Sequence, residues 1–388
     1  MANVTLIATA PMGLEAIVAR EVKNLGYENV RVENGRVEFE ADELAIARCN
    51  LWLRTADRVL VKMGEFKATT FEELFEGTKA LDWHNWLPKH AEFPVDGKSQ
   101  KSQLSSVPAC QGIVKKAIVE KMKEAYRLEW FPEDGPLYRC QVSLLKDVAL
   151  LTIDTSGPGL HKRGYRKLTA QAPIKETLAA AMIDLSRWRP HRPFFDPFCG
   201  SGTIPIEAAM IGRNIAPGLL RELFTAENWD RVDEELWAQA REEAEDLAQD
   251  DRPMEILASD IDAEVLSLAN YHIRQAGFKD VIKVKNLPVK EMSVSSDYGV
   301  LVSNPPYGER IGEAKAVEQA YRDLGKLMQK NPTWSVFVLT SNKGFEKFYG
   351  QNADKKRKLF NGRIECNLYQ YLGPLPPLPK QEAEEVTI

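Results

Sequence analysis

The sequence predicts an α/β protein with a C-terminal doubly wound sheet preceded by two smaller α/β units. Three observations lead to this fold class. With 388 residues and 44% apolar composition, the chain is long enough for two or three soluble domains. Residues 4–63 follow the order strand, helix, strand, strand, helix, strand, which is typical of a ferredoxin-like sandwich. Residues 174–340 alternate helices with buried strands, as a doubly wound sheet requires.

The elements of the first half follow from apolar periodicity and turn residues. Asn34-Gly35 in "VRVENGRVEFE" suits the type I′ turn of a hairpin. "FEELFEGTKALDWHNWL" is helical in pattern, and "YRCQVSLL" with "VALLTIDT" predicts a second hairpin. The remaining expected elements are strands at 4–8, 56–63 and 92–97 and helices at 11–26, 41–52 and 107–127.

The second half predicts ligand binding at the carboxyl ends of its strands. "TSGPGLHKRGYRKLTAQAP" leads into it as an ordered connector, and the tail "PLPPLPKQEAEEVTI" is expected to be disordered. The expected helices are 174–187, 203–211, 262–276 and 314–330; the expected strands are 193–196, 255–259, 281–285, 299–303, 334–340 and a terminal pair near 357–372. Residues 217–251 are interpreted as an insertion between the first two strand–helix units.

Composition excludes several classes of protein. No window approaches 18 uncharged apolar residues, and the start of the chain lacks the pattern of a secretory leader, so we expect a cytoplasmic protein without a membrane partner. The five cysteines form no CxxC pair and do not cluster with the five histidines. We therefore expect reduced thiols and no metal.

Charge is distributed unevenly along the chain. The net charge is −5, but residues 222–251 hold twelve acids against two arginines. Without that stretch the remainder carries +5. Basic residues concentrate at 98–127, 162–175 and 355–363, so a polyanion can dock there while avoiding the acidic segment.

The strongest local motif is "FFDPFCGSGTIPIE", residues 194–207. A strand ends at Asp196, Gly200 and Gly202 bracket Ser201, and a helix begins near Thr203. Such glycines permit positive φ and let a ligand approach the backbone, while Asp196 can hold a cationic group. The motif is not GxGxxG, and no lysine follows the glycines as in a phosphate-binding loop. An S-adenosylmethionine site and a purely structural turn both remain open for this stretch alone.

Two further strand ends carry polar side chains. "EILASD" ends in Asp260, where a doubly wound fold binds the ribose hydroxyls of an adenosine cofactor. Asp262 suits the N-cap of the next helix better. "VIKVKN" ends in Asn286, whose amide can meet an adenine edge.

The fourth strand runs into "LVSNPPYGER", residues 301–310. The side-chain oxygen of Asn304 and the carbonyl of Pro305 can converge on one exocyclic amine, and the Tyr307 ring can stack on a flipped-out base. The alternative is a strand ended by Pro-Pro with Tyr307 in the core. Cys199 lies in the cofactor loop rather than beside Pro305, so amine methylation is favoured over thiolate-dependent carbon methylation.

These motifs resemble a known family. "DPFCGSGTIPIEAA", "SDID" and "NPPYGERIG" resemble class I S-adenosylmethionine-dependent amine methyltransferases, and "FPVDGKSQKSQLSSVPACQGIVKKAIVEK" looks like a THUMP RNA-binding domain. Over nearly its whole length the chain resembles the RlmL group of 23S ribosomal RNA guanine-N2 methyltransferases. The resemblance implies a mostly parallel Rossmann-like sheet with an antiparallel last strand. The implied domains are ferredoxin-like 1–65, THUMP 66–156, connector 157–172, methyltransferase 173–375 and tail 376–388.

The resemblance also implies roles for particular residues. Base positioning is assigned to Asn304, Pro305 and Tyr307. Cofactor contacts are assigned to Asp196, Gly200, Gly202, Thr203, Asp260, Asn286 and Thr177, the last in the segment 173–177 near the methionine end. Asn286 stands where many relatives carry an acid. Some relatives continue into a second fused methyltransferase domain, so this chain is expected to perform one methylation.

The leading hypothesis is methylation of the N2 amine of a guanine in 23S ribosomal RNA, free or in an assembly intermediate. Three alternatives stay open: a transfer-RNA guanine-N2 methyltransferase, an adenine-N6 methyltransferase, and a non-catalytic RNA-binding assembly factor. The expected RNA contacts are Lys98, Lys101, Lys115, Lys116, Arg163 and Arg166. The alternative for these cations is an ordinary solvated face.

Overall fold

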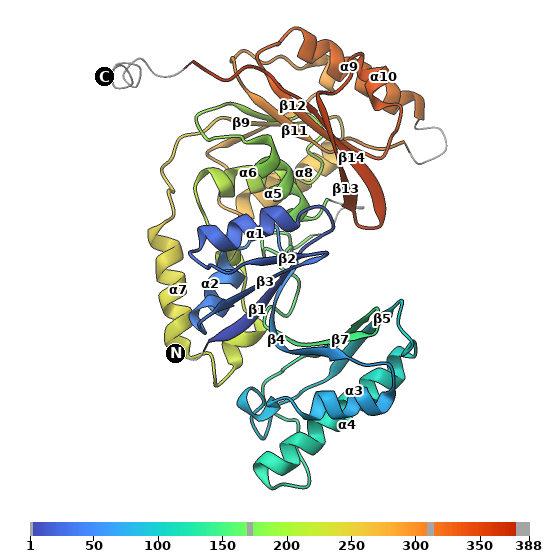
Figure 1. Ribbon diagram of the computed structural model, residues 1–388. Helices are drawn as coiled ribbons and strands as arrows, with labels where there is room; N and C mark the ends of the chain where they lie inside the picture. Colours follow the sequence, from blue (N-terminus) through green and yellow to red (C-terminus); the bar gives the residue numbers. More distant parts are fainter. Residues whose placement is uncertain (1–2, 169–173, 309–313, 378–388) are drawn as a thin grey trace, which may run out of the picture. The chain divides into compact units, whose positions relative to one another are not determined.

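The computed structural model describes residues 3–168, 174–308 and 314–377 (Figure 1). It divides into two compact units. The first unit comprises Met1–Arg163 together with Ala216–Leu247, and the second comprises Gly164–Ile215 together with Ala248–Ile388. Each unit contains its own seven-stranded sheet flanked by helices. The predicted fold class is confirmed.

The sheet of the first unit runs through both small domains without a break, in the order β2-β3-β1-β4-β7-β6-β5. Its strands are β1 Val4–Thr9, β2 Arg31–Glu33, β3 Arg36–Ala41, β4 Arg58–Lys67, β5 Val95–Gln100, β6 Cys140–Leu145 and β7 Val148–Asp154. The long strand β4 pairs with β1 at its start and with β7 farther along, and the register shifts between Lys62 and Gly64. This bulge lets one strand serve both domains, and the pairing with β7 explains why β4 extends past its predicted end.

The helices of the first unit are α1 Glu15–Asn24, α2 Leu44–Trp52, α3 Phe71–Lys79 and α4 Val107–Tyr126, together with α7 Glu234–Asp246 from later in the chain. Helix α3 begins with a capping box in which the Thr70 hydroxyl accepts from the Glu73 amide and Glu73 accepts from the Thr70 amide. Helix α4 ends at Arg127, which adopts the left-handed conformation. Its bounds agree closely with the predicted helix 107–127.

The sheet of the second unit has the order β10-β9-β8-β11-β12-β14-β13. Its first five strands are parallel, and β14 and β13 are antiparallel to their neighbours. The strands are β8 Phe194–Asp196, β9 Ile256–Asp260, β10 Ile282–Asn286, β11 Val300–Ser303, β12 Ser335–Thr340, β13 Lys355–Asn361 and β14 Ile364–Tyr371. Chain order reverses between β8 and β11, which is where an open α/β sheet binds ligands.

Helices cover both sides of this second sheet, and central strands β8, β11 and β12 are wholly buried. The helices are α5 Glu176–Ser186, α6 Thr203–Gly212, α8 Ala263–Gln275, α9 Ala314–Gln329 and α10 Phe345–Tyr349. Helix α10 has only five residues and was not expected, because so short a segment carries no helical period. The other four lie within two residues of their predicted bounds.

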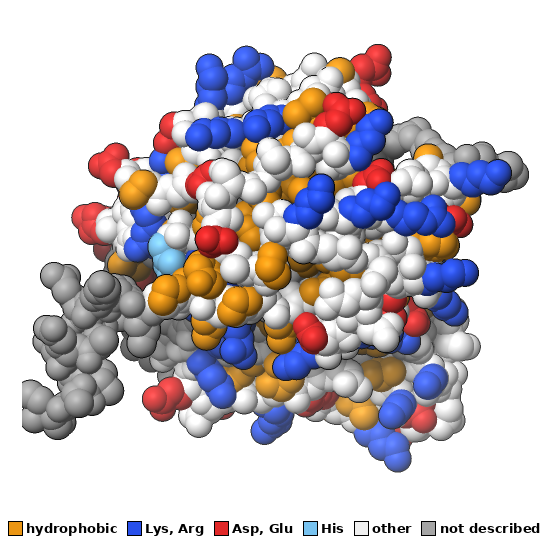
Figure 2. All heavy atoms as spheres, turned by 90° about the horizontal axis from the view of Figure 1, so that it is seen from above, with side chains coloured by type: hydrophobic (Ala, Val, Ile, Leu, Met, Phe, Trp, Pro, Cys, Tyr) orange, Lys and Arg blue, Asp and Glu red, His pale blue; other side chains and the backbone are white. Residues whose placement is uncertain are grey.

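The surface is polar and the cysteines are internal. On the face shown in Figure 2, Lys and Arg side chains are spread over most of the surface, and hydrophobic side chains are interspersed with polar ones. All five cysteines are buried with free thiols. Among the described residues, every helix is too short or too polar to cross a membrane. The expected disorder of the tail falls largely on 378–388, outside the described residues.

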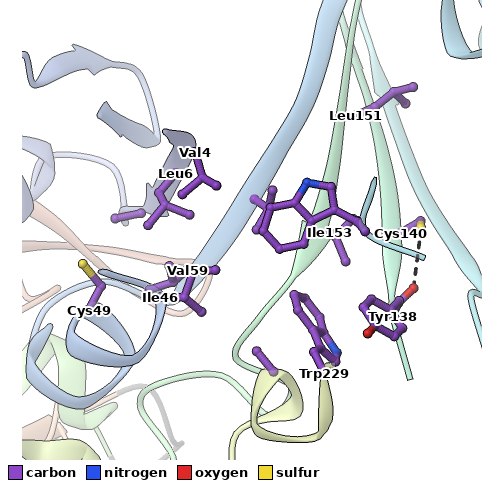
Figure 3. Packing of buried hydrophobic residues seen from close by; sticks show 14 of the residues in the cluster. Val4, Leu6, Ile46, Cys49, Val59, Tyr138, Cys140, Leu151, Ile153 and Trp229 are labelled. Carbon is purple, nitrogen blue, oxygen red and sulfur yellow. Dashed lines mark hydrogen bonds between the residues drawn. The ribbon is translucent and has the colours of Figure 1, made fainter. Parts of the chain in front are cut away.

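Residues 216–247 belong to the core of the first unit, which corrects their interpretation as part of the second domain. Trp229 is buried and its ring stacks on Tyr138 at a centroid distance of 4.6 Å (Figure 3). The indole Nε1 of Trp229 donates to the carbonyl of Leu137 at 2.9 Å. Apolar burial therefore makes this segment part of the first unit, although the residues on either side of it in sequence belong to the second.

Polar contacts fix the same segment against helix α2. The Arg48 guanidinium donates to both carboxylate oxygens of Glu243 at 2.7 Å, the paired geometry that makes Arg–carboxylate contacts strong. A Cβ added at Gly218 would lie 2.6 Å from the Cα of Leu51, so only glycine allows this close backbone approach. The acidic segment thus has a structural role that its charge alone did not reveal.

Candidate active site

Four neighbouring strands of the second unit end at one edge of its sheet. Asn286 pairs with Asp260 across β10 and β9, and Asp196 pairs with Ala258 across β8 and β9. Strand β11 lies on the other side of β8 and ends at Ser303, directly before Asn304. Because these strands are parallel, their polar carboxyl ends face the same edge. The topology thus brings the predicted residues of four separate motifs together.

The loop after β8 exposes bare backbone. Gly200 has φ of +51° and Gly202 has φ of +86°, both in the region that favours glycine. A Cβ at Gly200 would meet no atom within 4 Å, so its surroundings are open. The Gly200 amide donates to Oδ2 of Asp260 at 3.0 Å, which joins the loop to the end of β9. The loop can therefore admit a ligand closely on one side while it is held on the other.

Asp196 is a buried carboxylate with one unused oxygen. Its Oδ1 accepts from the Ser303 hydroxyl at 2.5 Å and from the Phe198 amide at 3.2 Å. Its Oδ2 is buried and has no partner among the described residues. Burial raises the pKa of Asp196 to about 7, although the hydrogen bond from Ser303 opposes this shift. A buried acceptor without a donor is costly, so Oδ2 is suited to a cationic or hydrogen-bonding ligand group.

Asp262 caps a helix as predicted from the sequence, and the ribose contact of Asp260 stays a prediction. Oδ1 of Asp262 accepts from the amides of Glu264 and Val265, so Asp262 caps helix α8. Burial raises the pKa of Asp260, whose two oxygens accept from backbone amides of the cofactor loop and of Asp262. Asp260 is thus held rigidly at the strand end where a ribose is expected.

Asn286 is partly committed to the protein. Its Nδ2 donates to the carbonyls of Asp260 and Ile261 at 3.0 and 3.1 Å, which leaves the side-chain oxygen as the group able to meet a ligand. Ile261 itself is 73% exposed, an unusual position for a large apolar side chain directly after a buried strand. Sequence reasoning passed over Ile261, although an apolar residue between two acids at a strand end was the available signal.

The residues of the fourth motif form a small hydrogen-bonded cluster. The Tyr307 hydroxyl donates to Oδ1 of Asn304 at 2.6 Å, and it accepts from Nδ2 of Asn361 at 3.1 Å. Burial raises the pKa of Tyr307, so this hydroxyl stays protonated. The Pro306 carbonyl accepts from the Tyr321 hydroxyl at 2.8 Å, which fixes the backbone after Pro305. Sequence reasoning missed Asn361 because it lies more than fifty residues away.

The methionine-end segment contains a second unused polar atom. Thr177 is fully buried, and within the described part of the chain its Oγ1 has no partner. Arg166 donates to the Thr203 hydroxyl and the Ile174 carbonyl, and it forms an ion pair with Glu176 at 3.4 Å. Arg166 therefore ties together the starts of α5 and α6. The rest of the predicted segment, 169–173, lies outside the described residues.

Two of the predicted RNA contacts, Arg163 and Arg166, are occupied by contacts within the protein. Arg163 is only 2% exposed, and its guanidinium donates to the carbonyls of Leu160 and Arg54. Arg166 has 13% side-chain exposure and is occupied as described above. Both were chosen because they stand in a basic segment, but their long-range partners turn them inward.

The lysines of the THUMP-like half are more accessible. Lys98, Lys101 and Lys116 are exposed. Lys115 is half-buried, and its Nζ donates to Glu133 at 2.7 Å and to the Phe93 carbonyl at 3.0 Å. Contact with RNA stays a prediction for the three exposed lysines, and Lys115 has a structural role that competes with it.

Family comparisons agree with this geometry. Residues 163–370 match the family described as "RMKL-like, methyltransferase domain", which covers more than half of the chain. The chain belongs to this methyltransferase family. Residues 5–60 match the "RlmL ferredoxin-like domain" and residues 68–154 match the THUMP domain, so the predicted domain types are confirmed.

Relatives of this family member are similar over its whole length. "Putative RNA methyltransferase YpsC" of Bacillus subtilis is 55% identical over 98% of this chain and 99% of its own. "Ribosomal RNA large subunit methyltransferase K/L" of Methylococcus capsulatus is 33% identical over 97% of this chain, which spans about half (53%) of that relative.

Two solved structures have nearly the same fold. A structure described as a "predicted N6-adenine-specific DNA methylase" from Listeria monocytogenes has a TM-score of 0.93 and 56% identity, covering 96% of this chain and 97% of that one. SMU.472, solved in complex with SAH, has a TM-score of 0.92 and 48% identity, covering 97% of this chain and all of that one.

The residues of this chain fit an adenosyl methyl donor. S-adenosylmethionine carries an ammonium group, and Asp196 offers a buried carboxylate oxygen without a partner. Its ribose needs acceptors such as Asp260, and its passage beside the loop needs the open space at Gly200. The orphan hydroxyl of Thr177 lies in the segment assigned to the methionine end.

Proposed function

We propose that the protein transfers a methyl group from S-adenosylmethionine to the exocyclic N2 amine of a guanine in 23S ribosomal RNA. The observation that carries the proposal is the adjacency of two strand ends: Asn304 follows β11, and Ser303 beside it donates to the carboxylate of Asp196 on β8. This adjacency supports the proposal, because a base held by residues 304–307 would lie next to a cofactor held by the loop after β8. The THUMP domain and the names of the relatives support RNA as the substrate class.

The protein contributes mainly positioning. S-adenosylmethionine supplies an electrophilic methyl group when bound. Oδ1 of Asn304 and the carbonyl of Pro305 accept the two amine hydrogens, which directs the nitrogen lone pair toward the methyl donor. Tyr307 donates to Oδ1 of Asn304 and so fixes the amide orientation, while the second lone pair of that oxygen stays available. The proton leaves after methyl transfer, so no strong general base is needed.

The competing functions share this chemistry. An exocyclic amine of adenine fits the same acceptors, and the Listeria structure is described as an adenine-specific DNA methylase. The K/L relatives are named for ribosomal RNA, and the THUMP domain of this chain favours RNA over DNA. A guanine in transfer RNA is the nearer competitor, and an assembly factor without activity is a third.

The test is nucleoside analysis combined with one point variant. Stripped 23S ribosomal RNA from a deletion strain is incubated with labelled S-adenosylmethionine and digested for mass spectrometry. We expect N2-methylguanosine with the wild-type protein and a loss of at least about 100-fold with Asn304→Ala, because misplacement of the amine costs about this much. Unchanged N2-methylguanosine in 23S RNA of the deletion strain would refute the proposal. Methylated adenosine would support the first competitor instead.

Binding of SAH to Asn304→Ala provides the control. We expect its affinity to stay within about twofold of wild type, because the side chain of Asn304 accepts a hydrogen bond from Tyr307 of its own motif. A variant that complements the deletion phenotype without turnover would favour the assembly-factor hypothesis.

A further inference from the structure

The hairpin of β13 and β14 at the edge of the second sheet carries an unusual density of positive charge. Residues 355–371 contain five Lys or Arg residues against one acid, although the whole chain has a net charge of −5. We name these cations the basic edge; they are Lys355, Lys356, Arg357, Lys358 and Arg363. All except Arg357 are exposed. Among the described strands, β13 pairs with β14 alone and ends the sheet, as the hairpin in Figure 1 shows.

Acidic neighbours neutralise the basic edge only weakly. Lys356 pairs with Glu346 at 2.5 Å and Lys358 pairs with Glu365 at 2.6 Å, with side chains of both lysines about half exposed (48% and 56%). Such exposed pairs contribute at most about 1 kcal/mol and can exchange for another anion. Among the described residues, Lys355 and Arg363 have no acidic group within ion-pair distance.

The basic edge is continuous with the base-positioning cluster. Asn361 ends β13, and its Nδ2 donates to the Tyr307 hydroxyl, which in turn donates to Asn304. A strand rises about 3.3 Å per residue, so Lys358 lies about 10 Å along the strand from Asn361. A chain of phosphates that delivers one nucleotide to Asn304 would thus pass within reach of the lysines of β13.

Protection of an exposed sheet edge is the simpler explanation for some of these lysines. Edge strands often carry a lysine that prevents pairing with another chain. That explanation accounts for one or two charges on β13, but it does not account for Arg363, which lies in the turn after the strand. It also gives no reason for the hydrogen bond between the end of β13 and Tyr307.

We propose that the basic edge binds the phosphate backbone of the RNA strand that flanks the target nucleotide. This inference rests on the proposed function in one respect, namely that the polyanion is the RNA substrate. The basic edge then holds the flanking strand while Asn304, Pro305 and Tyr307 hold the base. Binding of this kind is independent of sequence and strongly dependent on salt.

The test compares two charge-matched variants of the full-length protein. The edge variant carries Lys355→Gln, Lys358→Gln and Arg363→Gln. The control variant carries Lys290→Gln, Lys326→Gln and Lys330→Gln, three exposed lysines around a separate surface hollow of the same unit. Affinity for stripped 23S ribosomal RNA and for a short single-stranded RNA of mixed sequence is measured over a range of salt concentrations.

We expect the edge variant to bind both RNAs at least about tenfold more weakly, and the slope of log K against log salt to fall by about 2, because three lost contacts to single-stranded phosphates remove about 0.7 each. The control variant should change affinity less than about twofold. SAH affinity and melting temperature should be unchanged in both. An edge variant that matches the control in affinity and slope overturns the inference.

Two further outcomes separate this inference from the proposed function. Wild-type protein that binds RNA through the basic edge but forms no N2-methylguanosine would refute the proposed function alone. Wild-type protein that forms N2-methylguanosine while the edge variant is unimpaired would refute the basic edge alone. If the triple variant melts early, Arg363→Gln by itself replaces it; a slope lower by about 0.7 supports the inference and an unchanged slope overturns it.

Discussion

Replacement of Asp196 by asparagine should make the free protein more stable at alkaline pH and remove its affinity for the cofactor. Asp196 is fully buried, one of its oxygens has no partner, and burial raises its pKa from 3.8 to about 7. Ionisation of this carboxylate therefore lowers the free energy of unfolding whenever the cofactor is absent. An amide of the same shape carries no charge to bury.

The magnitude follows from proton linkage. Because the pKa is higher in the folded state, folding takes up a proton, so the stabilisation is fully present below about pH 4 and is lost as the pH rises to about 7. The rise of the Asp196 pKa from 3.8 to about 7 corresponds to about 4 kcal/mol, at about 1.36 kcal/mol for each tenfold change in proton affinity. Between pH 5 and pH 8.5 the free energy of unfolding of the wild type should fall relative to Asp196→Asn by about 3 kcal/mol.

The assay is urea unfolding of the second unit at both pH values, together with SAH titration. Wild-type affinity for SAH should weaken up to about tenfold per unit below pH 7, because the protonated carboxyl loses its attraction for the ligand's ammonium group. Asp196→Asn should bind weakly at every pH. The matched control is Ser303→Ala, which removes a donor to Oδ1 but keeps the carboxyl group. Both pH dependences should persist in this variant and move to higher pH, because the Ser303 hydrogen bond lowers the pKa of Asp196. A stability difference that is the same at both pH values would refute the reasoning.

Three shorter predictions test other parts of the chain. Gly200→Ala should weaken SAH binding at least about tenfold, because its Cβ enters the open space expected to hold the ligand. The control is Gly277→Ala, at φ of +83° with equally open surroundings. It should lower the free energy of unfolding by the same backbone term of about 1–2 kcal/mol without affecting SAH binding. Trp229→Ala should lower the stability of the first unit by about 3–5 kcal/mol in urea unfolding. Arg163→Ala should lower the free energy of unfolding by about 2 kcal/mol and leave RNA affinity unchanged. Lys116→Ala should leave the free energy of unfolding unchanged and weaken RNA binding.

The site could be predicted from sequence where topology alone brings residues together. Asp196, Asp260 and Asn286 each end a short strand and Asn304 directly follows one, and parallel strands place such residues at one sheet edge whatever their separation in sequence. The division of labour between Asp260 and Asp262 was also predictable, because the position before a helix favours a capping acid. In these cases local pattern and fold point to the same answer.

Partners supplied by distant parts of the chain could not be predicted in this way. Asn361 approaches Tyr307 only because the antiparallel hairpin β13–β14 folds back along β12. Arg163 donates to the distant Arg54 carbonyl, and nothing in the segment "GPGLHKRGYRK" distinguishes it from an exposed cation. Local composition shows where charged residues are concentrated in the sequence, but not which of them form contacts inside the folded protein.

The acidic segment shows in the same way that charge composition does not reveal which residues are buried. Trp237, Ala240 and Ala244 form the buried stripe of α7, while Glu242 and Glu245 on its other face are exposed. One helix therefore fastens the first unit together and leaves it with a strongly acidic patch. Such a patch repels a polyanion at short range, within about a Debye length of 8 Å at physiological salt. We expect RNA to approach the first unit on surfaces away from α7, which would reconcile binding of a polyanion with the negative net charge.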